Sequence, residues 1–240
     1  MGLSYGADTY KDSLFIKRWL HCRRFAHALK LLDLKAGEKI LDYGCGDGYF
    51  LKLIKNHFPA VEAAGFEPYA PKCREAQKEL SGLDIDVFQS IESIRGQKFD
   101  KITCLETAEH LADKELEILG LNVRSLLVRG GLFIITVPIE IGVPALIKNT
   151  YRLLKNRHYD NLNITNYFKA IAGFGIKRRI ITLEPGLEYI FSHTGFDHRV
   201  FEKQLAKYFF IERKEGQPWA FFGAIFNNNL YYFCRLNYKA

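Results

Sequence analysis

Apolar residues follow two alternating patterns along most of the chain. Helical spacing predicts helices over residues 49–58, 71–80, 113–128 and 197–207. Short apolar runs predict strands over residues 39–43, 61–66, 84–88, 99–105, 132–137, 209–214 and 231–236. Strands that alternate with helices are typical of an α/β fold with a mainly parallel sheet and right-handed crossovers.

Two segments depart from this alternation. Residues 1–35 form an N-terminal cap with helical spacing, which precedes the main domain, residues 36–240. Residues from about 139 to 192 form an insertion, which we expect over the edge of the sheet where ligands bind. The insertion opens with a helical pattern over 143–157. One face of that pattern is apolar (Val143, Leu146, Ile147, Tyr151, Leu154), and the other is largely basic (Lys148, Arg152, Lys155).

The composition excludes several classes of protein. Hydrophobic residues make up 48% and charged residues 25% of the 240, which is typical of a folded globular chain rather than a disordered one. The longest apolar stretch, 131–139, is well short of the roughly 20 residues that cross a bilayer. The five cysteines are scattered singly, and the N-terminal segment lacks the pattern of a secretory signal. We therefore expect a cytoplasmic protein.

The formal net charge of +7 is unevenly distributed. Residues 141–180 hold eight basic residues and one acid, Asp160, an excess equal to that of the whole chain. This segment is suited to an anionic membrane surface, to an anionic substrate, or to a nucleic-acid backbone; alternatively, it is a solvated lid. Nucleic acid is the partner we do not favour, because the basic residues alternate with Leu, Ile and Val more than with stacking aromatic residues.

A glycine-rich turn follows the first predicted strand. Gly44, Gly46 and Gly48 lie between that strand and the next helix, where missing Cβ atoms let a ligand contact backbone amides at a helix N-terminus. The spacing differs from the GxGxxG of dinucleotide sites, since Tyr49 stands where the third glycine is needed. A nicotinamide-dependent oxidoreductase is therefore the enzyme class we rank last.

The stretch ILDYGCGDGYF, residues 40–50, resembles motif I of the class I S-adenosylmethionine-dependent methyltransferases. The resemblance implies a Rossmann-like, seven-stranded, mostly parallel sheet with helices on both faces. It implies S-adenosylmethionine as the cofactor and S-adenosylhomocysteine as the product. Glu67 ends the second strand 21 residues after Gly46, where a carboxylate accepts hydrogen bonds from both ribose hydroxyls. The residues that we assign to the cofactor are Asp42, Gly44, Cys45, Gly46, Gly48, Glu67, Pro68 and Leu105.

Residues 99–111 (FDKITCLETAEHL) and 126–138 (LLVRGGLFIITVP) are similar to the fourth and fifth strands of the small-molecule branch, which includes the ubiquinone-biosynthesis O-methyltransferases. There, and in small-RNA ribose 2′-O-methyltransferases, a Glu-x-x-Glu-His pattern supplies metal ligands. Glu106, Glu109 and His110 match it. The same residues also suit a cap of the turn beneath the cofactor, and we do not favour a metal. The Asn/Asp-Pro-Pro-Tyr element of amino-nitrogen methyltransferases is absent.

Methyl transfer from a sulfonium needs a group that removes a proton from the acceptor. His110, His193 and His198 are the candidates, because an imidazole exchanges protons near neutral pH. His198 is the first choice, since FSHTGFDHRVF (191–201) lies where related enzymes place a substrate-facing histidine; His110 is the second. We expect O-methylation of a small-molecule, lipid-linked or sugar-like acceptor. The alternatives are a metal-assisted RNA 2′-O-methyltransferase and a non-catalytic cofactor-binding module. The sequence does not indicate an oligomeric state.

Overall fold

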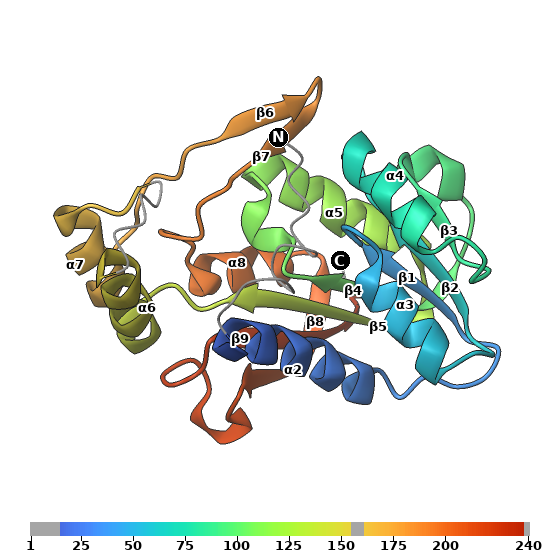
Figure 1. Ribbon diagram of the computed structural model, residues 1–240, viewed down its shortest axis with the longest axis horizontal. Coiled ribbons are helices and arrows are strands. Elements are labelled where there is room, and N and C mark those ends of the chain that lie inside the picture. The colour runs from blue at the N-terminus through green and yellow to red at the C-terminus, as the bar shows by residue number, and fades with distance from the viewer. Residues whose placement is uncertain (1–14, 155–160, 238–240) are drawn as a thin grey trace. The chain divides into compact units, whose positions relative to one another are not determined.

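The computed structural model describes residues 15–154 and 161–237 (Figure 1). Seven strands form one sheet, hydrogen-bonded in the order β3-β2-β1-β4-β5-β9-β8. β1 pairs in parallel with β2 and β4, β2 pairs in parallel with β3, and β8 pairs with β9 in antiparallel fashion. The strands are β1 (Lys39–Tyr43), β2 (Glu62–Phe66), β3 (Asp86–Phe88), β4 (Phe99–Leu105), β5 (Leu127–Pro138), β8 (Phe209–Gln217) and β9 (Asn229–Leu236). The predicted α/β class with a seven-stranded, mostly parallel sheet is confirmed.

By its internal contacts the chain divides into two compact units. The first is Met1–Cys104 with Ser125–Phe133, and the second is Leu105–Arg124 with Ile134–Ala240. The α-helices are α2 (Phe15–Leu32), α3 (Tyr49–His57), α4 (Ala70–Glu79), α5 (Asp113–Leu126), α6 (Gly142–Leu154), α7 (Ile164–Ala172) and α8 (His198–Leu205). Short 3-10 helices are η1 (Ile91–Ile94), η2 (Ala108–His110) and η3 (Ala220–Phe222).

The core of the first unit follows from strands that are apolar on both faces. β1 is buried at every residue after Lys39, and β2 at every residue after Glu62, as in parallel strands covered on both sides. Register pairs Asp42 with Gly65, so the ends of β1 and β2 lie side by side. The turns that follow these two strands therefore begin at the same edge of the sheet.

Strand β5 begins at Leu127, five residues before the predicted start, and helix α5 ends at Leu126, two residues before its predicted end. We expected Gly130 and Gly131 to separate a helix from a strand, but both lie within β5. A Cβ atom at Gly131 would stand 2.9 Å from the backbone oxygen of Asp100 on β4. The glycine therefore serves the close approach of two strands rather than a turn.

The second unit contains the β8–β9 hairpin, α8 and the segment that follows β5. That segment, for which no alternation was predicted, holds α6, α7 and a separate antiparallel pair, β6 (Ile181–Glu184) and β7 (Leu187–Tyr189) (Figure 1). The helix expected over 143–157 is α6, which ends at Leu154; its last three predicted residues lie outside the described residues, as do residues 1–14 of the cap. Among the residues described, no helix has the length and apolar character that a membrane crossing requires.

Candidate functional site

The glycine turn after β1 is held against the end of β2 by backbone hydrogen bonds. The N–H groups of Gly44 and Cys45 both donate to the carbonyl oxygen of Phe66, at 2.7 and 3.1 Å. Gly44, Gly46 and Gly48 have φ values of 80°, 59° and 79°, in the left-handed region that favours glycine. The turn thus exposes backbone without side chains between the end of β1 and the start of α3.

Gly48 has a second constraint beside its backbone conformation. A Cβ atom there would lie 2.7 Å from Cδ1 of Leu80, which is buried at the end of α4. We expect Gly48→Ala to lower the free energy of unfolding by about 2–3 kcal/mol, from the left-handed strain and the crowding together. Gly37→Ala is the matched control: Gly37 has a φ of 80° with nothing within 4 Å of its Cβ position, so it should lose about 1–2 kcal/mol. Urea unfolding of both variants measures the difference, and equal losses would show that contact with Leu80 costs nothing.

Glu67 joins the end of β2 to the glycine turn. Its Oε2 accepts a hydrogen bond from the N–H of Gly46 at 3.0 Å, and its Oε1 accepts one from the N–H of Tyr69 at 3.0 Å. Burial raises the pKa of Glu67 to about 7, although these two hydrogen bonds oppose the shift. Because a carboxylate has about four acceptor sites, two of them remain for a ligand. The structure therefore brings together two residues that the sequence singled out 21 positions apart.

Asp42 lies beneath the turn, inside the sheet. Thr103 Oγ1 on β4 donates to Asp42 Oδ1 at 2.7 Å, and burial raises the pKa of Asp42 to about 7. The side chain of Cys45 also points into the core, since a Cβ on Gly65 would stand 2.7 Å from its Sγ. The thiol of Cys45 is therefore turned away from a ligand of the glycine turn. Sequence reasoning missed Thr103, because a threonine within an apolar strand carries no signal of its own.

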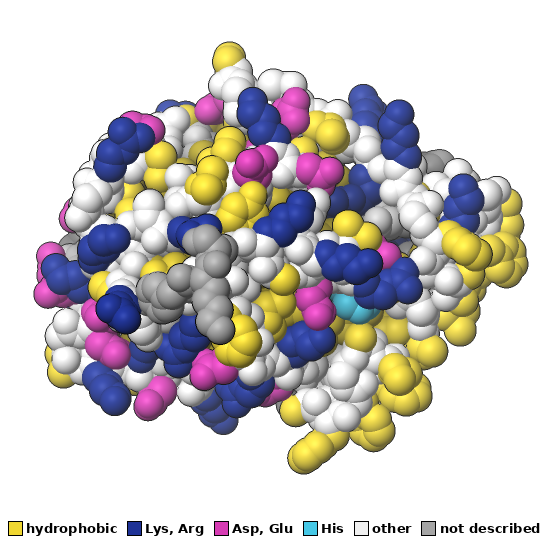
Figure 2. All heavy atoms as spheres, turned by 180° about the vertical axis from the view of Figure 1, so that it is seen from behind, with side chains coloured by type: hydrophobic (Ala, Val, Ile, Leu, Met, Phe, Trp, Pro, Cys, Tyr) yellow, Lys and Arg dark blue, Asp and Glu magenta, His cyan; other side chains and the backbone are white. Residues whose placement is uncertain are grey.

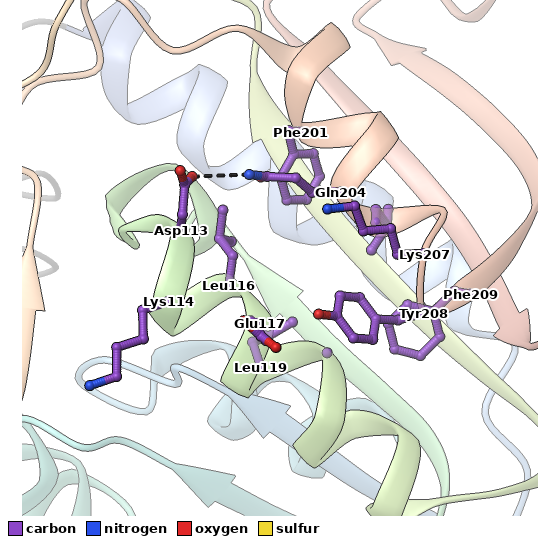
Figure 3. A pocket seen from close by; sticks show the side chains of 12 residues that line it. Asp113, Lys114, Leu116, Glu117, Leu119, Phe201, Gln204, Lys207, Tyr208 and Phe209 are labelled. Atoms are coloured by element: carbon purple, nitrogen blue, oxygen red, sulfur yellow. Dashed lines mark hydrogen bonds between the residues drawn. The ribbon is translucent and has the colours of Figure 1, made fainter. Parts of the chain in front are cut away.

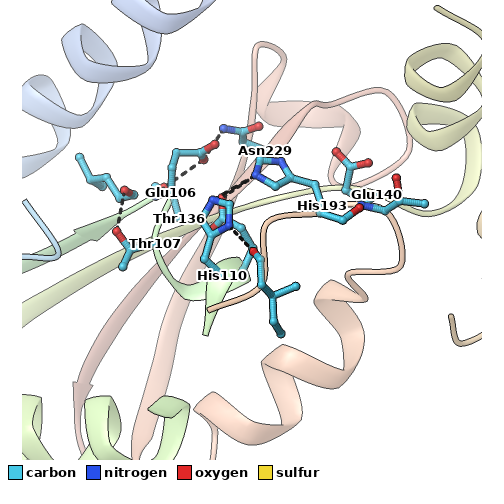
Figure 4. Close-up of polar contacts among 12 residues, drawn as sticks. Glu106, Thr107, His110, Thr136, Glu140, His193 and Asn229 are labelled. Carbon is cyan, nitrogen blue, oxygen red and sulfur yellow. Dashed lines mark hydrogen bonds and ion pairs between the residues drawn. The ribbon is translucent and has the colours of Figure 1, made fainter. Parts of the chain in front are cut away.

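A second polar cluster follows β4, in the other unit (Figure 4). Leu105 is buried at the end of the strand, and Glu106 adopts a positive φ of 54°. Glu106 Oε1 accepts a hydrogen bond from Asn229 Nδ2 at 2.7 Å, and Thr136 Oγ1 lies 3.4 Å from the same oxygen. The structure thus turns Glu106 toward β5 and β9.

His110 pairs with His193 rather than with Glu106. His110 Nδ1 lies 2.7 Å from the carbonyl oxygen of Ile190, which only accepts, so this nitrogen carries the proton. His110 Nε2 is then an acceptor, and His193 Nε2 donates to it at 3.2 Å. Burial lowers the pKa of His110 to about 4 and that of His193 to about 3, so both rings are neutral at neutral pH. The ring of His110 also stacks on Tyr189, with centroids 4.7 Å apart.

Glu109 completes a group with metal-binding residue types. One potential ligand atom from each of Glu109, His110 and His193 lies within 4.8 Å of the others. Arg178 donates to the carbonyl oxygen of Glu109, and its guanidinium lies 5.3 Å from the ring of Phe196. The group therefore differs from the predicted set: the half-buried His193, and not Glu106, lies beside Glu109 and His110. The chain separation of 83 residues between the histidines explains why no local pattern predicted this pairing.

A buried ion cluster fixes helix α6. Arg152 donates to both oxygens of Glu140, at 2.7 and 3.2 Å, and Lys148 donates to Oε1 at 3.0 Å. Burial by itself raises the pKa of Glu140, but the two cations outweigh it and lower the pKa to about 2. Arg152 also donates to Asn149 Oδ1 at 2.8 Å. These contacts hold the basic face of α6 against the end of β5.

His198, the first choice of the sequence analysis, is the first residue of α8 and is buried. Burial lowers its pKa, and the structure places it outside the group of Glu109, His110 and His193. The groove beside α8, of about 370 Å³, is lined by α5 and α8, and Gln204 bonds Asp113 across it (Figure 3). This groove contains none of the residues predicted for cofactor, base or metal.

Comparison with known proteins adds a family and a fold. A family model described as "Methyltransferase domain" matches residues 16–176. A ubiquinone biosynthesis O-methyltransferase from Bartonella bacilliformis is 31% identical over 159 residues, which are 59% of this chain and 64% of the relative. In matches to other ubiquinone O-methyltransferases, the chain spans 34% to 36% of the relative's length.

Two solved structures share the fold over nearly the whole chain. The PH0226 protein from Pyrococcus horikoshii OT3 has a TM-score of 0.64 at 18% identity, and 96% of each chain is covered. The magnesium protoporphyrin IX methyltransferase from Synechocystis PCC 6803, with bound S-adenosylhomocysteine, has a TM-score of 0.59 at 17% identity and covers 98% of this chain and 95% of its own. At these identities the likeness shows the fold alone.

Proposed function

Because the chain belongs to the methyltransferase-domain family, we propose that it transfers a methyl group from S-adenosylmethionine to an oxygen atom of a small-molecule acceptor. The predicted membership of the class I methyltransferases is confirmed, so the chain is an enzyme.

The observation that best supports S-adenosylmethionine as the methyl donor is the hydrogen bond between the N–H of Gly46 and the carboxylate of Glu67. A backbone without side chains after β1 suits the amino-acid portion of the donor, and a buried carboxylate one strand away suits its ribose hydroxyls. When bound, S-adenosylmethionine supplies a methyl group already activated by the sulfonium. We assign Asp42, Gly44, the backbone of Cys45, Gly46, Gly48, Glu67, Pro68 and Leu105 to its binding.

The neutral histidine pair is our candidate for the proton acceptor. His110 Nδ1 is committed to the carbonyl of Ile190, and His193 donates through Nε2, so Nδ1 of His193 keeps its lone pair for the proton of an acceptor hydroxyl. A hydroxyl that loses its proton as the new C–O bond forms is a stronger nucleophile. Nδ1 of His193 accepts that proton and passes it on to solvent, because burial lowers the pKa of this ring to about 3. His198 is the second candidate.

A search for the acceptor and a set of variants test this assignment. Release of S-adenosylhomocysteine would be measured over a panel of phenols, catechols, polyprenyl phenols and sugars, with calorimetry to follow binding. We expect His110→Ala and His193→Ala each to lower kcat on the best acceptor by about 10²- to 10⁴-fold, with affinity for S-adenosylhomocysteine within about twofold of wild type. His198→Ala should change kcat by less than about tenfold.

Three outcomes would contradict parts of the proposal. A large loss of kcat in His198→Ala alone would move the base to that residue. Tight binding of S-adenosylhomocysteine with no turnover over the panel would favour a non-catalytic module. Activity on RNA that disappears with EDTA would favour metal-assisted chemistry, which we do not favour because Glu106 bonds Asn229 instead of joining the histidines.

The charge distribution and the cysteines support the proposed acceptor and compartment. The basic excess of residues 141–180 favours an anionic or lipid-linked acceptor. Cys45, Cys73, Cys104 and Cys234 are buried thiols that form no disulfide, as expected in the reducing cytoplasm.

A further inference from the structure

We propose that an outward-facing apolar surface, made by α6, α7 and the loop between β8 and β9, binds the surface of an anionic lipid bilayer. We call it the docking surface; all of its residues belong to the second unit. The inference does not depend on the methylated acceptor, because binding to lipid is measured without turnover.

Helix α6 is amphipathic, but its basic face points inward and its apolar face points outward. In a water-soluble domain the apolar face of a surface helix normally packs on the core. Here the basic face is turned inward onto the buried Glu140, while the apolar stripe is exposed; Ile147 is 64% and Leu154 80% exposed. The other exposed members of the stripe are Val143, Leu146 and Tyr151. Water is a poor solvent for such a stripe, so it is suited to an apolar environment.

Helix α7 continues the exposed apolar surface. Thr150 of α6 and Tyr167 of α7 are hydrogen-bonded at 2.9 Å, which joins the two helices through their polar side chains. The side chains of Ile164 and Phe168 on α7 are exposed, Phe168 by 61%. Phe174, which follows the helix, is also exposed. The helix pair therefore presents large apolar side chains on its outer side.

The loop between β8 and β9 is uncharged and largely apolar, and hydrogen bonds of a buried asparagine hold its backbone. Residues 218–228 (PWAFFGAIFNN) contain no charge, and five large apolar side chains among them are exposed: Trp219, Phe221, Phe222, Ile225 and Phe226. Asn227 is fully buried; its Oδ1 accepts from the N–H of Trp219, and its Nδ2 donates to the carbonyl oxygens of Trp219 and Gly223, at 2.6 to 2.7 Å. The loop is thus held in shape with its aromatic residues outward, which reduces the ordering cost of insertion.

The loop and the helices are connected by a direct contact. Lys148 of α6 donates to the carbonyl oxygen of Asn228 at the base of the loop, at 3.2 Å. Figure 2 views the molecule from behind Figure 1. Hydrophobic side chains gather along its lower and right-hand margins, where the loop between β8 and β9 and helices α6 and α7 lie. The exposed apolar residues therefore form one surface rather than scattered positions.

The charge around the docking surface selects a bilayer over a second copy of the chain. Lys148 and Arg152 are paired with the buried Glu140 and do not contribute to the outer charge. Three other basic residues of this segment, Lys169, Lys177 and Arg179, are exposed. A two-fold dimer would bring this basic surface against itself, and like charges repel. Anionic headgroups complement the same charges, and Trp and Phe side chains are typical of the boundary between headgroups and acyl chains.

Vesicle flotation tests the proposal with the full chain. We expect binding to phosphatidylcholine vesicles that contain phosphatidylglycerol, at least about tenfold weaker binding to phosphatidylcholine alone, and weaker binding in about 1 M than in about 0.1 M salt. The variant Ile147→Ser/Phe168→Ser/Phe221→Ser should bind anionic vesicles about a hundredfold more weakly. Phe210→Ser is the matched control: Phe210 is also 61% exposed but lies on β8 outside the docking surface, so its variant should bind like wild type.

A second measurement keeps the test decisive if a variant fails to fold. Brominated lipids should quench the fluorescence of wild-type protein, and Trp219→Phe should lose most of that quenching. No binding to anionic vesicles, or an equal loss in Phe210→Ser, would overturn the proposal. So would sedimentation of the lipid-free protein as a dimer that the triple variant dissociates, because the surface would then be a contact between copies.

Discussion

At about pH 6 we expect the protein to bind S-adenosylhomocysteine about tenfold more weakly than at about pH 8. The pKa of Glu67 is raised to about 7 by burial, so its carboxyl group is mostly protonated at the lower pH. Ribose hydroxyls that donate to the carboxylate favour its ionised form. Binding therefore releases a proton and strengthens as the pH rises through the pKa. Calorimetry at several pH values measures both the affinity and the proton release.

The matched control for this prediction is Glu67→Gln, which keeps the size of the side chain and removes its charge. Hydrogen bonds to a charged group contribute about 1.5–3 kcal/mol each, so losing two of them should weaken binding about a hundredfold or more at about pH 8. The remaining affinity should no longer depend on pH between about 6 and 8. A pH dependence that persists in Glu67→Gln would assign the titration to Asp42, whose pKa burial also raises to about 7.

Arg152→Met should be among the most destabilising single substitutions in the chain. It leaves the buried Glu140 with Lys148 as its remaining cation and removes the hydrogen bond to Asn149. Breaking a buried ion pair from one side costs about 3–5 kcal/mol, because the other charge stays buried without full compensation. Urea unfolding at neutral pH measures the loss. The variant should also bind anionic vesicles more weakly, since Arg152 holds the apolar stripe of α6 outward.

Arg235→Met is the control, because Arg235 pairs with Glu212 at 3.0 Å in a half-exposed position. An exposed pair of this kind contributes less than about 1 kcal/mol. The losses in the free energy of unfolding of Arg152→Met and Arg235→Met should also differ in their pH dependence. The pKa of Glu140 is lowered from 4.5 to about 2, so its stabilising effect is present above about pH 4.5 and is lost as the pH falls through 2. The deficit of Arg152→Met should shrink in acid, and equal losses in both variants would refute the role of burial.

Neutral imidazoles suit the proposed chemistry. A protonated histidine has no lone pair to accept a proton, whereas burial keeps His110 and His193 uncharged at neutral pH. The carbonyl of Ile190 sets the tautomer of His110, which in turn sets that of His193. Ile190 follows β7 directly, so the small hairpin of β6 and β7 places the carbonyl oxygen that accepts from His110.

The sequence by itself determined the features that depend on residues close together in the chain. β1 and β4 have the predicted bounds, and the glycine turn, the start of α3 and the acid at the end of β2 lie where the pattern predicted them. Periods of 2 and 3.6 residues and the special backbone freedom of glycine are local properties, so they can be read without knowledge of the fold. The predicted break at Gly130 and Gly131 was wrong: both lie within β5, and Gly131 is required by the close approach of the backbone of β4.

Only the tertiary structure decided which polar residues meet and which face of a helix is exposed. His110 meets His193 across 83 residues, and Glu106 meets Asn229 across 123, so no spacing along the chain indicates either contact. The periodicity of α6 showed two faces but not which one points outward. That was settled by Glu140: a buried carboxylate needs cations beside it, and the basic face of α6 supplies them, which leaves the apolar face to the outside.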